Sequence, residues 1–135
     1  MDTIAEKYGT YKGYDYLVRR IRGMHLCAYV RIPETHEFYG KHYDNIPIEC
    51  HGGLTFSEFT DFAPLKKPVY DSTFIGSIWS GKWIEEKIPK GYWIGWDYAH
   101  AGDWMPLMQN ENGKKWTPDE AVLEAKQVIE QLKLR

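Results

Sequence analysis

The sequence has little cysteine, with two among 135 residues, Cys27 and Cys50. Disulfide staples are therefore not what we expect to hold the fold. They are not needed either, because domains of roughly 100–150 residues bury enough surface to fold without crosslinks. We expect both thiols to be reduced, as is usual for a cytosolic protein.

Long apolar runs are also absent. No window approaches the roughly 18 consecutive apolar residues that a membrane-spanning helix needs. Residues 1–7 lack the basic start, the apolar stretch and the small-residue cleavage site of a secretory signal. We therefore expect a soluble protein of the cytoplasm that does not insert into a membrane.

No charge of either sign dominates, since 17 Lys and Arg residues face 19 Asp and Glu residues. Basic runs do not exceed two residues, as at Lys66 and Lys67. A nonspecific nucleic-acid binder normally presents a basic face, so this class is not expected. What is abundant is aromatic: six Trp, ten Tyr and five Phe make up 16% of the chain. Such side chains suit interfaces and flat ligands.

The apolar periodicity predicts an α+β protein with a single domain over residues 1–135. Strand-like runs cover residues 14–21, 24–32, 46–50, 73–79 and 92–98. In the last of these, Tyr92, Ile94 and Trp96 point to one side, and Trp93 and Asp97 to the other. We expect a short helix over 1–8 and an irregular segment over 57–72, where Pro64 and Pro68 block a helix.

The clearest helix signal is at the C-terminal end. Thr117 is placed as an N-cap, Pro118 as the first helical residue, and Glu120 completes a capping box. Apolar residues then recur at three- and four-residue spacing: Ala121, Val122, Ala125, Val128, Ile129 and Leu132. The prediction is a mostly antiparallel sheet of about four to six strands with this amphipathic helix packed on it.

Two polar corners are candidates for chemistry. Asp97, His100 and Asp103 lie at three-residue spacing across the end of one predicted strand and the loop after it, and His51 follows another strand, before Gly52. These four side chains could hold a divalent metal such as zinc or manganese. They could instead line a metal-free pocket that holds a ligand without a cofactor. The carboxylates could also serve only as acceptors for backbone N–H groups in turns.

Further candidates surround these corners. Tyr39, Lys41 and His42 form a loop whose cations and rings suit phosphate groups and flat bases, although a solvated surface loop has the same composition. Tryptophans next to the acid–histidine segment, Trp93 and Trp96 among them, are expected to line a cleft. A homo-oligomer interface would use them equally well.

Two segments carry a resemblance to a known group of proteins. They are HGGLT at residues 51–55 and WDYAHAGD at residues 96–103. Together with neighbouring residues over about 10–135, they resemble a family of small, uncharacterised bacteriophage and prophage proteins. The resemblance implies a phage accessory role in the host cytoplasm. Proteins of this kind often counter bacterial immunity, some by trapping or cleaving nucleotide second messengers.

Our leading expectation is a phage-type, counter-defence protein that binds a small nucleotide-like ligand, as a homo-oligomer. The predicted contacts are His51, Asp97, His100 and Asp103, with Trp93, Trp96, Tyr39, Lys41 and His42 around them. Two alternatives stay open. One is a metal-dependent phosphodiesterase that uses the first four residues as ligands. The other is an inhibitor that binds a host protein through its aromatic side chains.

Overall fold

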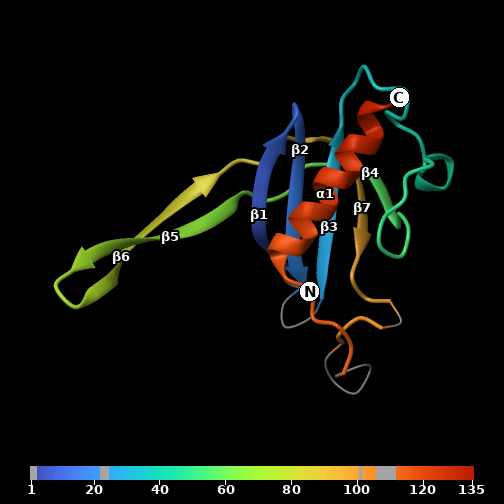
Figure 1. Ribbon diagram of the computed structural model, residues 1–135. Helices are drawn as coiled ribbons and strands as arrows, with labels where there is room; N and C mark the ends of the chain where they lie inside the picture. The colour runs from blue at the N-terminus through green and yellow to red at the C-terminus, as the bar shows by residue number, and fades with distance from the viewer. Residues whose placement is uncertain (1–2, 22–24, 101, 106–111) are drawn as a thin grey trace.

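A five-stranded antiparallel sheet forms the body of the protein in the computed structural model, which describes residues 3–21, 25–100, 102–105 and 112–135 (Figure 1). The strand order is β1-β2-β3-β7-β4. The bounds are Thr3–Tyr11 for β1, Tyr14–Ile21 for β2, Leu26–Ile32 for β3, Phe56–Thr60 for β4 and Gly91–Asp97 for β7. The predicted α+β architecture is confirmed. Met24 and the predicted turn residues Arg22 and Gly23 lie outside the described residues.

The central strands β3 and β7 are buried on both faces. In β7, Tyr92, Ile94 and Trp96 belong to the larger core, whereas Trp93 belongs to a smaller core on the opposite side. Neighbouring β3 alternates in the same way, with Val30 in the larger core and Tyr29 in the smaller one. This is the two-residue periodicity that the sequence predicts.

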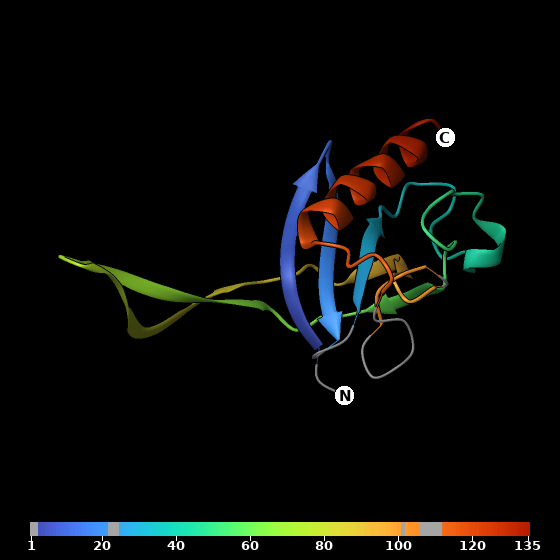
Figure 2. The ribbon, with the colours of Figure 1, turned by 60° about the horizontal axis from the view of Figure 1, so that its bottom comes forward.

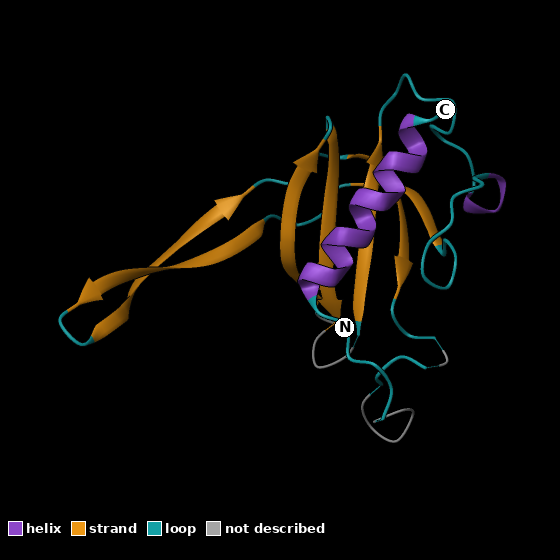
Figure 3. Cartoon of the chain, viewed as in Figure 1, coloured by secondary structure: helices purple, strands orange, loops and turns teal. Residues whose placement is uncertain are grey.

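Helix α1, Pro118–Lys133, covers the face of the larger core (Figure 3). The Thr117 side chain accepts a hydrogen bond from the backbone of Glu120, and the Glu120 carboxylate accepts one from the Thr117 backbone. This confirms the predicted capping box. The buried helix residues are Ala121, Ala125, Val128, Ile129 and Leu132. Their burial against the sheet is the main reason that the helix is stable.

A two-stranded arm projects from the body, away from α1 (Figures 1 and 2). It consists of β5, Leu65–Thr73, and β6, Gly76–Glu86. The sequence interpretation was wrong here in two ways. The segment expected to be irregular contains most of β4 and most of β5, and the strand expected over 73–79 is interrupted by a turn at Phe74 and Ile75. Pro68 is tolerated because an isolated ribbon has only edge strands.

Two further expectations are corrected. In place of the helix expected over residues 1–8, the described residues from Thr3 onward belong to β1, which pairs with β2 with one register shift between Ala5 and Lys7. The strand expected over 46–50 does not form, although Ile46 and Ile48 are buried. Its backbone bonds to a side chain instead: Gln131 accepts from the Glu49 N–H at 2.8 Å and donates to the Glu49 carbonyl at 2.7 Å. This extended segment is therefore fixed to α1 and not to a neighbouring strand.

In the part of the chain that the structure describes, no helix has the length and apolar character needed to cross a membrane.

Candidate functional site

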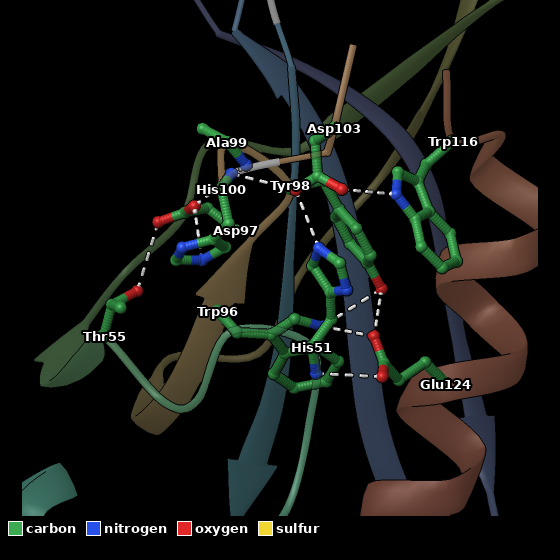
Figure 4. Close-up of polar contacts among 10 residues, drawn as sticks. All are labelled: His51, Thr55, Trp96, Asp97, Tyr98, Ala99, His100, Asp103, Trp116 and Glu124. Carbon is green, nitrogen blue, oxygen red and sulfur yellow. Dashed lines mark hydrogen bonds and ion pairs between the residues drawn. The ribbon is translucent and has the colours of Figure 1, made fainter. Parts of the chain in front are cut away.

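The two predicted polar corners meet at Asp103 (Figure 4). One carboxylate oxygen lies 2.7 Å from His51 Nε2 and accepts from the His100 backbone N–H at 2.9 Å. The other oxygen accepts from the Trp116 indole N–H at 2.8 Å. Asp103 thus joins three segments: the turn that contains His51, the loop that follows β7 and the residues that precede α1.

Asp103 is the only charged side chain that is buried among the described residues, with 2% of its surface exposed. Burial alone would raise the pKa of its carboxyl group. The hydrogen bonds from His51, the His100 backbone and Trp116 outweigh burial, so the pKa of Asp103 lies below its usual value. The carboxylate is therefore ionised at neutral pH and is held by three donors.

Aromatic rings surround the His51 imidazole. It stacks on Tyr98 with ring centroids 5.0 Å apart, and the Trp116 ring lies 4.9 Å away. The His51 side chain is 22% exposed. With Nε2 bonded to Asp103 and both neighbouring rings in contact, this imidazole is fixed in position.

Glu124 of α1 accepts hydrogen bonds from residues of the same corner. Its Oε2 accepts from the His51 backbone N–H at 3.0 Å. Its Oε1 accepts from the Trp96 indole at 3.0 Å and from the Tyr98 hydroxyl at 2.5 Å. Burial, together with the hydrogen bond to Glu124, raises the pKa of Tyr98. The polar atoms of these buried rings are thus satisfied by one helix side chain.

Asp97 and His100 form a second, more exposed pair beside the first. His100 Nε2 lies 3.2 Å from Asp97 Oδ1, which also accepts from the Ala99 backbone. Gly52 is needed for this packing, because a Cβ atom there would lie 2.1 Å from His100 Nε2. Gly52 also has a φ of 70°, which favours glycine.

The four candidate metal ligands form two pairs: His51 with Asp103, and His100 with Asp97. Among the residues that the structure describes, no group of three or more His, Cys, Asp and Glu side chains is arranged to hold a metal ion. A metal centre at this corner therefore stays a prediction of the sequence alone. The observed role of Asp103 is closer to that of an acceptor that orders turns.

The other predicted residues gather at the opposite end of β7. Tyr39 packs on Tyr92 near the start of the strand, whereas His51 packs on Tyr98 just beyond its end. These tyrosines are six extended residues apart, roughly 20 Å. The single pocket expected from both sets of residues is therefore not formed.

A surface hollow of about 690 Å³ lies at the Tyr39 end. We call it the ring hollow, and its lining residues are Arg31, Glu34, Tyr39, Phe59, Thr60, Asp61, Pro89, Lys90 and Gly91. Phe59 also lines an adjacent hollow together with predicted residue His42. The Lys41 carbonyl accepts a hydrogen bond from the Tyr92 hydroxyl, but Lys41 lines neither hollow.

Sequence reasoning missed most of the ring hollow. Phe59 and Asp61 lie in the segment expected to be irregular, and Lys90 lies just before the strand predicted over 92–98. Arg31 reaches the hollow because its Nε donates to the Lys90 carbonyl at 3.0 Å. The available signal was the exposed aromatic Phe59 among polar neighbours, a pattern that becomes informative only once β4 is identified as an edge strand.

Two of the three tryptophans expected to line a cleft, Trp93 and Trp96, are in the cores, whereas the third, Trp104, is half-buried. Trp93 is 0% and Trp96 is 1% exposed. Each indole N–H has an internal acceptor, which is the Pro89 carbonyl for Trp93 and Glu124 for Trp96. The polar atom therefore does not require solvent, and both rings fill the two faces of β7.

Both cysteines are free. Cys27 packs against the smaller core and Cys50 against the larger one, so they lie on opposite faces of the sheet. Burial raises the pKa of Cys27 to about 11 and that of Cys50 to about 12. Neither thiol is thus activated as a nucleophile at neutral pH.

Comparisons with known proteins yielded no match: no family model, curated protein or solved structure is significantly similar to this chain.

Proposed function

We propose that this protein binds a small nucleotide-like ligand in the ring hollow. The observation that carries the proposal is the lining itself, which combines two aromatic rings with side chains of both charges around about 690 Å³. This volume lies within the range typical of small-molecule sites. A planar, anionic molecule with hydroxyl groups would match this lining. Its planar part could stack on the rings, its anionic part could pair with the cations, and its hydroxyl groups could donate to the carboxylates.

The aromatic wall would hold the base. Tyr39 and Phe59 meet edge to face with centroids 5.4 Å apart, and Phe59 is 63% exposed. A ring exposed to this extent on an edge strand offers a face for stacking. Base–aromatic stacking contributes about 1–3 kcal/mol per base.

The charged side chains would bind the rest of the ligand. Arg31 and Lys90 are the cations that would face phosphate, and Glu34 and Asp61 would accept from sugar hydroxyls or base amino groups. Gly91 leaves space for the guanidinium, because a Cβ there would lie 2.5 Å from Arg31 Nε.

The biological role that we propose is sequestration of a nucleotide second messenger by a phage accessory protein in the cytoplasm of its bacterial host. The support is the sequence resemblance of the HGGLT and WDYAHAGD segments to small phage proteins. In this account the Asp103 corner, which contains both segments, holds the scaffold and does not touch the ligand.

Isothermal titration calorimetry against mono-, di- and cyclic nucleotides tests this proposal. We expect one nucleotide class to bind, and Phe59→Ala to weaken it about 5- to 100-fold through lost stacking. Lys90→Gln should also weaken binding, because a charge contact is removed. The difference in affinity from the wild type should grow as the salt concentration is lowered, since the contact is then screened less. Phe74→Ala, at an exposed phenylalanine of the arm, is the matched control and should bind normally.

Two outcomes would overturn the proposal. One is the absence of binding heat with every nucleotide. The other is a ligand whose affinity is the same for Phe59→Ala and the wild type.

A further inference from the structure

The arm has one predominantly aromatic face. Cross-strand pairing places Pro68 opposite Trp83 and Tyr70 opposite Trp79. Directly paired residues share a face of a ribbon, and residues two apart on one strand do so as well. We call Pro68, Tyr70, Trp79 and Trp83 the aromatic face. The neighbouring cross-strand pairs point to the opposite face of the ribbon, where Val69, Ile78 and Ile84 are mixed with charged residues.

A β-bulge brings the two tryptophans together. The register shifts between Val69 and Tyr70, because β6 carries Ser80 and Gly81 as extra residues. The Ser80 hydroxyl donates to the Val69 carbonyl at 2.7 Å, and Gly81 has a φ of 82°. With the bulge in place, Trp79 and Trp83 lie on the same face with centroids 5.7 Å apart. Bulges of this kind re-aim side chains.

This face is open to solvent. Tyr70 is 58%, Trp79 50% and Trp83 56% exposed, and Phe74 at the tip is fully exposed. An isolated two-stranded ribbon is marginally stable in water. Contiguous apolar surface on such a projection (Figure 2) marks an interaction site.

The charge of the arm is compatible with a second copy of the chain as the partner. Between residues 68 and 84 only Asp71 and Lys82 are charged, so this part of the arm has no net charge. At its base, Lys66 pairs with Glu85 at 3.5 Å and Lys67 with Glu86 at 3.9 Å. Two identical surfaces can pack together only if they do not repel, and a neutral face meets this condition.

The available area agrees with pairing of two arms. The exposed parts of Tyr70, Trp79 and Trp83 on the aromatic face, together with Phe74 at the adjoining tip of the arm, come to roughly 500 Å² per chain, since a buried aromatic side chain covers about 150–250 Å². Two copies together would remove on the order of 1,000 Å² from water, which is the lower limit for a stable interface.

We propose that the occupant of the aromatic face is the same face of a second copy of this chain, packed across a two-fold axis. In such an isologous contact, each tryptophan pair covers the pair of the other copy. This homodimer does not depend on the ligand site, because the ring hollow is built from the body of the protein.

Sedimentation velocity over a range of micromolar concentrations tests the proposal. The wild type should sediment as a species of twice the 15.9 kDa chain mass. The double variant Trp79→Ser with Trp83→Ser should sediment as the monomer. Ile78→Ser with Ile84→Ser removes comparable exposed apolar surface from the other face and should remain a dimer. A monomeric wild type, or a dimeric tryptophan variant, would overturn the proposal.

Tryptophan emission provides a second readout of the same dissociation. Dilution of the wild type should shift its emission to longer wavelength as Trp79 and Trp83 become exposed. Replacing both with Phe should remove most of that shift while preserving an aromatic face. Emission that does not change with concentration in the wild type would contradict dimerisation through this face.

Discussion

Asp103 is the residue on which the geometry of the polar corner depends most. Its two oxygens face donors from His51, His100 and Trp116. Asp103→Asn would place an amide NH2 against at least one of these donors and leave buried groups unpaired. We expect a loss of about 1–3 kcal/mol in the free energy of unfolding, measured by urea denaturation.

Asp97→Asn is the matched control for this change. Asp97 has the same chemistry in the same loop region, but its side chain is 27% exposed and water can replace its partners. Its loss should be below about 1 kcal/mol. Equal losses for the two variants would show that the buried acceptor at Asp103 is not special.

The pH dependence of stability follows from the lowered pKa of Asp103. The unfolded carboxyl titrates near its usual pKa of about 3.9, and the folded one below that. The stabilisation is therefore fully present above about pH 4 and is lost as the pH falls through the folded pKa. Subtracting the unfolding free energy of Asp103→Asn from that of the wild type should give a difference that declines only below about pH 4. A difference that is constant with pH would contradict an ionised Asp103.

Alanine substitutions at Gly52 and Gly53 separate two energetic costs of adding a side chain, which are backbone strain and a clash with the His100 ring. Both have positive φ, of 70° and 81°, so alanine at either position strains the backbone by about 1 kcal/mol. Only at position 52 would the new Cβ also meet the His100 ring, whereas nothing lies within 4 Å at position 53. Gly52→Ala should therefore lower the thermal midpoint more than Gly53→Ala. Equal effects would mean that His100 moves aside freely.

At the scale of elements, the N-terminus of α1 depends on the Thr117 and Glu120 capping box. Thr117→Ala should cost about 1 kcal/mol of stability because backbone N–H groups of the first turn lose an acceptor. Glu120→Ala alone and the double variant complete a double-mutant cycle in urea denaturation. The two losses should not be additive, since each side chain bonds to the other's backbone. Strict additivity would contradict a functioning box.

The elements with well-buried residues, β2, β3, β7 and α1, could be predicted from the sequence, whereas the two edge strands β1 and β4 and the arm could not. Burial on one or both sides produced the alternation of β3 and β7 and the apolar positions of α1. Apart from buried Leu65 at its base, the arm is exposed or half-buried, so its sequence carries no inward-facing apolar stripe, and Pro68 was read as a break. In addition, the 46–50 segment has the alternation of a strand, but Gln131 takes the hydrogen bonds that a neighbouring strand would have used.

Part of the candidate site could also be predicted from the sequence. Polar residues that follow strands at Gly-rich turns pointed to a shared corner, and His51 does meet Asp103 there. The sequence could not show that Tyr39 lies at the opposite end of β7, because that depends on the sheet order. Phe59 and Lys90 became candidates only when β4 and β7 were seen to be neighbours.

At the scale of the whole molecule, three regions have different tasks in this account. The Asp103 corner fixes the loops at one end of the sheet. We propose that the ring hollow at the other end binds the ligand, and that the arm, which projects from the sheet (Figure 1), joins two copies. Because the regions are separate, variants at one of them should leave the other two intact. Tryptophan variants of the arm should therefore change the oligomeric state without abolishing nucleotide binding.

The location of the ligand is the central claim, and backbone chemical-shift mapping during titration with the nucleotide that binds tests it most directly. We predict the largest shifts at Tyr39, Phe59, Lys90 and Gly91, with the His51 and Asp103 amides unchanged. Largest shifts at His51, His100 and Asp103 would contradict the account and place the ligand at the polar corner.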